Sequence, residues 1–198
     1  MKIYTKTRTT EEPRLVIEYD GDSESPREWS NLGYFITVDR DYHSPDKNET
    51  LERIVKDTGD EAGSCEKHMK LIKKAYEEET DEKVYAIYPI CKYEHSAVSY
   101  SLGTKHGFDY SNNGFYIITE QGLKEIGVRK NKKAIEKFIT NELDVYTKWC
   151  NGEVYQFTLY DDQGEIEDSC GGFYDIESIR EYLPKEWDKE DLNDYFDF

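Results

Sequence analysis

Hydrophobic residues recur every three or four positions in several segments of the chain, which is the spacing of an amphipathic helix. The strongest such segment spans residues 130–149, and its apolar stripe runs from Ala134 to Trp149, so we expect it to be the main packing helix. A glycine and a proline end two shorter patterns, because neither residue continues a helix well. Besides 130–149, the spacing predicts helices over residues 49–58, 64–79, 120–126 and 176–183.

Alternating apolar and polar residues, or short runs of β-branched and aromatic residues, predict strands elsewhere. Residues 153–160 and 165–170 flank a polar Asp-Asp-Gln-Gly turn and should form a hairpin. The stretch GTKHGFDYSNNG, residues 103–114, is rich in glycine and ends in Asn-Gly, so we expect the chain to fold back there. The other predicted strands are 2–9, 15–19, 34–39, 84–90, 95–102 and 114–119.

Together these elements predict an α+β fold, with one domain built from a mostly antiparallel sheet and packed helices. A chain of 198 residues suits a single core, and aromatic residues, including 17 Tyr, add buried area that the low apolar fraction of 36% understates. We expect Trp29 and Leu32 to anchor a loop on this core. The domain should cover residues 1–184, and an acidic, aromatic tail over 185–198 should be a docked segment or an interaction peptide.

The charge balance restricts the classes of partner. Forty-three Asp and Glu against 26 Lys and Arg give a net charge of −17, which repels phosphate backbones and disfavours direct nucleic-acid binding. A basic protein is the partner that such a surface fits. No apolar run approaches the roughly 20 residues that span a bilayer, so we expect a soluble protein without a membrane partner. The sequence does not predict its oligomeric state.

Four cysteines, at positions 65, 91, 150 and 170, form no CxxC pair, and no secretory signal pattern opens the chain. This combination predicts a cytoplasmic protein with free and buried thiols. We predict no cofactor. Zinc is the one alternative, because thiolate and imidazole are good zinc ligands and their spacing in the chain is short. The four residues that such a site would use are Cys65, His68, Cys91 and His95.

The candidates for acid–base chemistry are His95 and Asp109, with Ser96 beside them. A carboxylate near an imidazole fixes its tautomer and raises its basicity, which general acid–base catalysis requires. A histidine beside a serine on a strand is also a common structural hydrogen-bonding pair. The GxSxG, HExxH, GxxxxGK[ST] and GxGxxG motifs are absent, which argues against several large enzyme classes.

Excess carboxylate usually serves only solubility. It has a second interpretation, because a face of spaced carboxylates can imitate the phosphate rows of DNA and occupy the basic groove of a nuclease or polymerase. Two clusters fit this interpretation, one at the end of a predicted helix and one in the tail. They consist of Glu77, Glu78, Glu79, Asp81 and Glu82, and of Glu186, Asp188, Glu190, Asp191, Asp194 and Asp197.

Five short motifs, in the same order along the chain, resemble a family of uncharacterised accessory proteins of tailed phages and prophages. They are SPREWSNLG at 25–33, YEHS at 93–96, FDYSNNGF at 108–115, GEVYQF at 152–157 and DSCGGFY at 168–174. Residues 107–109 depart from the family, which tends to carry Cys-Pro-Trp-Asp there, so a role for that cysteine does not transfer. The resemblance implies a phage origin and a role in host takeover or in evading host defence.

Two functional hypotheses follow. In the first, the chain is a non-enzymatic acidic protein that engages and inhibits a basic host protein of defence or nucleic-acid handling, with DNA mimicry as one mode. In the second, it is an enzyme or sensor that binds a small, nucleotide-like ligand in a polar pocket around His95 and Asp109. The charge and the missing catalytic motifs favour the first hypothesis.

Overall fold

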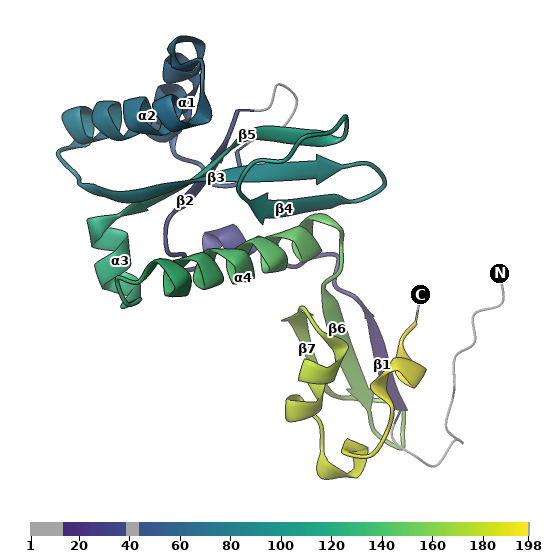
Figure 1. The fold of residues 1–198 in the computed structure, drawn as a ribbon. Helices are drawn as coiled ribbons and strands as arrows, with labels where there is room; N and C mark the ends of the chain where they lie inside the picture. Colours follow the sequence, from purple (N-terminus) through teal and green to yellow (C-terminus); the bar gives the residue numbers. More distant parts are fainter. Residues whose placement is uncertain (1–13, 39–43, 198) are drawn as a thin grey trace. The chain divides into compact units, whose positions relative to one another are not determined.

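The chain folds into helices and antiparallel sheets in a computed structural model that describes residues 14–38 and 44–197 (Figure 1). The predicted α+β class with antiparallel sheets is confirmed. Two compact units are present. The large unit spans residues 26–147, and the small unit is formed by the two ends of the chain, up to residue 25 and from residue 148. The predicted strand at 2–9 lies outside the described residues.

The large unit contains a four-stranded antiparallel sheet in the order β2-β5-β3-β4. The central strands are long, and β5 is buried along its second half, since it carries β-branched and aromatic residues there. Register shifts interrupt its pairing with β3 at two places, which bends the pair. The strands are β2 (Tyr34–Thr37), β3 (Val84–Glu94), β4 (Val98–Leu102) and β5 (Tyr110–Thr119).

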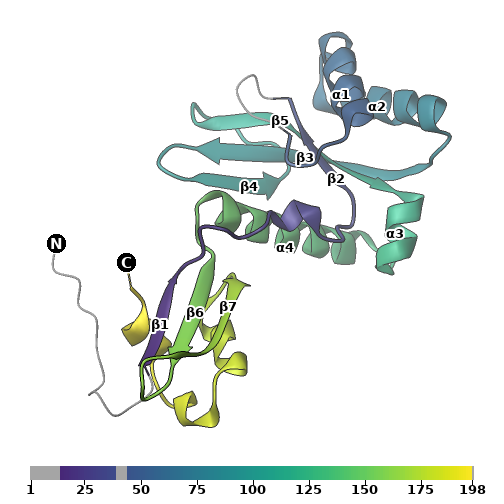
Figure 2. The same ribbon diagram turned by 180° about the vertical axis from the view of Figure 1, so that it is seen from behind.

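Helices cover both faces of this sheet (Figures 1 and 2). On one face, α1 (Glu49–Ala62) and α2 (Cys65–Thr80) bury their apolar stripes against Ile36 and its neighbours on β3 and β5. On the other face lies α4 (Lys132–Cys150), whose Tyr146 ring meets the ring of Phe35 at 5.8 Å. Adjacent residues of β2 therefore point to opposite helical layers, as the alternation of a strand requires.

Local capping explains where several helices begin and end. Asn48 and Ser64 accept N–H groups from the first turns of α1 and α2, and Gly63 ends α1 in the left-handed conformation, with φ of 65°. The predicted helix over 49–58 was therefore four residues too short. The short helix α3 (Glu120–Ile126) ends at Gly127, as predicted.

The small unit has a three-stranded antiparallel sheet in the order β1-β6-β7, and 3-10 turns pack against it. Its strands are β1 (Arg14–Tyr19), β6 (Tyr155–Tyr160) and β7 (Ile166–Phe173). Trp187 and Leu192 of the predicted tail are buried in its core beside Ile17 and Phe157. These two residues are therefore docked, which is one of the two forms predicted for the tail. Residues on both sides of position 184 thus share one core, and the predicted boundary there is not a boundary between units.

Two local predictions were wrong. Trp29 is 52% exposed and does not anchor its loop, whereas Leu32 is fully buried. Residues 110–114, expected to turn, begin β5, and Gly114 gives the close approach to Ile90 that the sheet needs at that point. The predicted short helix over 176–183 is present as a 3-10 helix, η2 (Ile176–Tyr182), which ends before Pro184.

Candidate functional site

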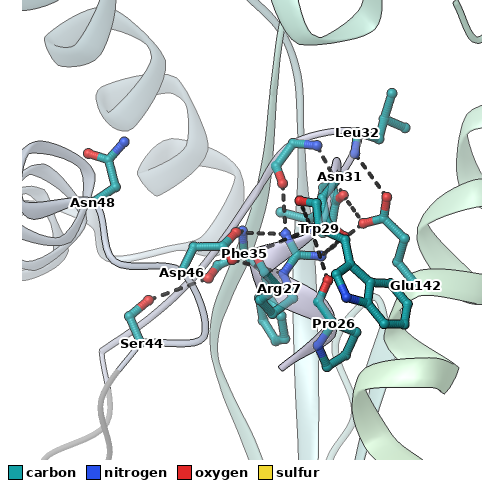
Figure 3. A network of polar contacts seen from close by, with 12 residues as sticks. Pro26, Arg27, Trp29, Asn31, Leu32, Phe35, Ser44, Asp46, Asn48 and Glu142 are labelled. Atoms are coloured by element: carbon teal, nitrogen blue, oxygen red, sulfur yellow. Dashed lines mark hydrogen bonds and ion pairs between the residues drawn. The ribbon is translucent and has the colours of Figure 1, made fainter. Parts of the chain in front are cut away.

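A buried polar network of the large unit is built around Arg27, in the 3-10 helix η1 (Pro26–Glu28) (Figure 3). Its side chain is only 2% exposed. Nε and Nη2 donate to the two carboxylate oxygens of Asp46 at 2.9 and 2.6 Å, and Nη1 donates to Oε2 of Glu142 at 2.9 Å. A bidentate pair of this kind is the strongest geometry for a guanidinium and a carboxylate.

Glu142 connects the loop to helix α4. Besides Arg27, its carboxylate accepts the backbone N–H of Leu32 at 2.9 Å and the hydroxyl of Tyr116. Burial and the negative charge of Glu142 raise the pKa of Tyr116. Burial lowers the pKa of Arg27, but the hydrogen bond and charge of Asp46 outweigh it, so that pKa is raised and the group stays charged.

The network holds the loop in place rather than offering a site to a ligand. Arg27 also donates to the side-chain oxygen of Asn31 and to the carbonyl of Gly33, so all five N–H groups of its guanidinium have partners. A Cβ at Gly33 would collide with the carbonyl oxygen of Ile117, so only glycine fits there. These contacts explain Arg27, Asn31 and Gly33 of the SPREWSNLG motif. The sequence alone does not predict them, because it does not show that Asp46 and Glu142 lie beside Arg27.

Residues of this loop line two hollows, and Trp29 lines both. One is a cavity of about 490 Å³ with a polar lining that includes Tyr34, Glu82 and Glu125. Burial, followed by the charges of Glu82, Asp46 and Glu125, raises the pKa of Tyr34. The other, of about 230 Å³, has a mostly apolar lining that includes Pro26 of η1 and Phe138 and Val145 of α4. The half-exposed Trp29 therefore borders both hollows.

The candidates for acid–base chemistry lie on two turns, one between β3 and β4 and one directly before β5. His95 and Ser96 occupy the turn between β3 and β4, and both are exposed. Nδ1 of His95 lies 3.9 Å from Oδ1 of Asp109, with the imidazole 71% and the carboxylate side chain 36% exposed. The two side chains lie near each other, but the distance between these atoms is longer than that of a hydrogen bond, and both side chains are open to water.

The four residues proposed as zinc ligands have separate surroundings. On α2, Nε2 of His68 lies 2.9 Å from the carbonyl oxygen of Val55, and its ring packs on Phe115. Burial raises the pKa of Cys65. Cys91 is buried in β3, whereas His95 is exposed. Within residues 14–38 and 44–197, no group of three or more His, Cys, Asp or Glu side chains is placed to hold a metal ion.

The thiols predicted to be buried near the hairpin are not: Cys150 is half-buried and Cys170 is exposed.

The acidic cluster of α2 is largely neutralised by neighbouring cations. Glu79 pairs with Arg53 at 2.5 Å, and Glu78 lies 3.8 Å from Lys74. Glu77 lies between Lys73 and Lys83, at 3.8 and 3.6 Å, and its pKa is lowered by the backbone N–H of Val84 and by those two lysines. Glu82 accepts the hydroxyl of Tyr76, and Asp81 caps the helix with a left-handed backbone.

The C-terminal segment carries six acids and two lysines, Lys185 and Lys189. Glu186, Asp188, Asp191 and Asp194 are exposed on 3-10 turns of the small unit, and Glu190 and Asp197 are half-buried. Asp191 caps the turn η4 (Leu192–Tyr195), and Glu190 accepts the hydroxyl of Tyr195. The small unit as a whole contains 21 acidic and eight basic residues, a net charge of −13, against −4 for the large unit with 22 and 18.

No protein-family model matches the chain, and comparison with curated proteins and with solved structures found no significant match. Among the helices of the described residues, none has both the length and the apolar character that crossing a membrane requires. The charges and geometry of the chain itself are therefore the basis for the function proposed below.

Proposed function

We propose that this protein is an acidic binding protein that engages a basic host protein through its small unit. The charge distribution carries the proposal: 13 of the 17 excess negative charges belong to the smaller of the two units. A field of one sign on a small body attracts oppositely charged partners and speeds their association. A protein that handles nucleic acid has such a basic surface, and the phage resemblance suggests that it belongs to the host.

The balance of acidic and basic residues favours the small unit over helix α2. Glu77, Glu78 and Glu79 each have a lysine or arginine within 4.0 Å, so this surface presents alternating charges to a partner. The C-terminal segment carries only Lys185 and Lys189 against its six acids. A rigid core under these acids, with Trp187 buried, keeps them in a fixed arrangement, as imitation of phosphate rows requires.

The alternative hypothesis, an enzyme or sensor around His95 and Asp109, needs a concave site where polar groups converge. The imidazole of His95 is mostly exposed and lies 3.9 Å from the carboxylate of Asp109. This geometry supports an enzyme or sensor less well than the charge of the small unit supports a binding protein. We therefore take the binding protein as the proposed function.

A salt-gradient binding experiment tests the proposal. The immobilised protein is exposed to host lysate, and retained proteins are eluted with increasing NaCl, with and without competing duplex DNA. We expect a nucleic-acid-handling protein that elutes steeply with salt, because screening weakens exposed charges, and that duplex DNA displaces.

Matched charge reversals then locate the surface. One variant replaces Glu186, Asp188, Asp191 and Asp194 by lysine, and the control replaces Glu66, Glu78, Glu79 and Asp81 on α2. We expect the first variant to lose the partner and the second to retain it. Equal retention by both variants would contradict the proposal.

A further inference from the structure

Strand β7 forms an open edge of the small unit's sheet. It pairs with β6 on one side, and no other strand formed by the described residues lies on its second side. Seven of its eight residues are exposed, and Ile166 is 64% exposed. Gly171 and Gly172 are among them, and because glycine has no side chain, their exposure is exposure of the backbone itself. An edge of this kind offers N–H and C=O groups to an incoming strand.

The opposite edge of the same sheet is closed by the chain itself. There, the C-terminal segment forms a parallel bridge between Phe196 and Ile17, and the N–H of Asp197 donates to the carbonyl of Ile17 at 2.7 Å. Tyr19 packs its ring against Phe196 at 5.0 Å and so covers this edge further. The small unit thus protects the edge at β1 while β7 stays accessible.

The charges on and beside β7 select the kind of strand that could pair there. Glu165, Glu167 and Asp168 are exposed, and the turn and strand at residues 161–173 contain no lysine or arginine. A second copy of β7 would place like charges opposite each other, which destabilises a sheet, whereas a strand with Lys or Arg would gain from each pair. This complementarity excludes self-pairing and favours a basic segment.

We propose that β7 accepts an extended, basic segment of a partner protein as an additional antiparallel or parallel strand. The proposal rests on the proposed function, because it gives the basic partner a mode of docking. Main-chain hydrogen bonds to residues 166–171 supply affinity, and the flanking carboxylates select lysine and arginine. A segment of about six residues spans this edge at roughly 3.3 Å per residue.

Two synthetic peptides of equal charge test this docking mode on the full-length protein. The first alternates lysine and valine over eight residues, and the second alternates lysine and proline, which removes half of the backbone donors and disfavours extended pairing. We expect the lysine–valine peptide to bind at least about tenfold more tightly, a difference of about 1.4 kcal/mol. It should also slow amide hydrogen exchange at residues 166–171.

The three outcomes separate this inference from the proposed function. Tighter binding of the lysine–valine peptide with protection of β7 supports it. Equal binding of both peptides without protection of β7 overturns the edge-docking mode and leaves charge-driven binding standing. Binding of neither peptide at low salt overturns both.

A charge-matched pair of variants adds a check on the location. Glu167→Lys with Asp168→Lys should weaken the lysine–valine peptide by about tenfold, because each reversal replaces an attractive cross-strand pair by a repulsive one. Glu66→Lys with Glu78→Lys changes the net charge equally but lies on α2 of the large unit, so it should weaken binding of the peptide by no more than about threefold through the loss of screened attraction. The opposite ranking would overturn the assignment to β7.

Discussion

The carboxylate of Asp20 accepts the backbone N–H of Gly172 at 2.9 Å. Asp20 follows β1 and Gly172 lies in β7, and β6 runs between these two strands. The contact falls where two residues of β7 oppose one residue of β6, between the pairs Tyr155–Phe173 and Phe157–Cys170. One side chain thus joins the outer strands and holds a bulge, which explains the paired glycines of the DSCGGFY motif.

The first prediction concerns Gly171. A Cβ there would lie 2.5 Å from Oδ2 of Asp20, so Gly171→Ala must displace the carboxylate from the bulge. We expect a loss of about 1–3 kcal/mol in the free energy of unfolding of the small unit, measured by urea denaturation. In the Asp20→Ala background the same change should cost clearly less, because the obstructing carboxylate is gone. Additive losses in this double-mutant cycle would refute the steric explanation.

The second prediction concerns the buried ion network. Arg27→Met leaves the carboxylates of Asp46 and Glu142 buried without their cation, and we expect a loss of about 3–5 kcal/mol in the free energy of unfolding. Arg27→Lys keeps the charge but not the bidentate geometry, so its loss should be intermediate.

Arg53→Met is the matched control for this series, because Arg53 also pairs with a carboxylate but is half-exposed. It should change the urea midpoint little. A midpoint shift in Arg27→Met no larger than that of the control would show that the network does not stabilise the large unit.

The third prediction concerns His95 and Asp109. Both side chains are substantially exposed and no hydrogen bond joins them, so His95→Ala and Asp109→Ala should each change the free energy of unfolding by less than about 0.5 kcal/mol. Under the proposed function, both variants should also bind the basic partner as the unmodified protein does. Loss of partner binding in either folded variant would contradict this prediction and would support a binding site at His95 and Asp109.

Periodicity predicted the elements well where one physical effect dominated. The apolar stripe of α4 contains Ile135, Ile139, Leu143 and Tyr146, all of which are buried. The hairpin of β6 and β7 was also found, because its turn residues are distinctive. Prediction failed where a tertiary contact decided the outcome: residues 110–114 extend β5 because Gly114 permits close packing against β3.

The candidate sites were less predictable, since they depend on which charges meet in space. The acids at positions 77–79 are continuous in sequence and suggest a negative face, but Arg53, 26 residues before Glu79, and nearby lysines neutralise them. The network around Arg27 joins residues 115 positions apart, and no local pattern indicates it. The division of charge between the units becomes visible only when both chain ends are seen to form one body.

The last prediction is a loss of stability at high pH. Burial, followed by the charges of Asp20 and Cys150, raises the pKa of Tyr174 from its usual 10.0 to about 12. The unfolded chain therefore releases this proton near pH 10, while the folded chain retains it, so the stabilisation is complete below pH 10 and is lost as the pH rises through 12. Burial also raises the pKa of Tyr76 and Tyr116, which adds to the effect.

Urea midpoints measured from pH 8 to pH 12 should thus fall above pH 10. Tyr174→Phe isolates the contribution of one phenol, because phenylalanine keeps the ring and carries no titratable group. The variant should show a shallower fall than the unmodified protein between pH 10 and pH 12, whatever the offset between the two proteins at pH 8. Parallel curves would show that the Tyr174 hydroxyl does not couple to folding, because linkage requires a difference in proton binding between the two states.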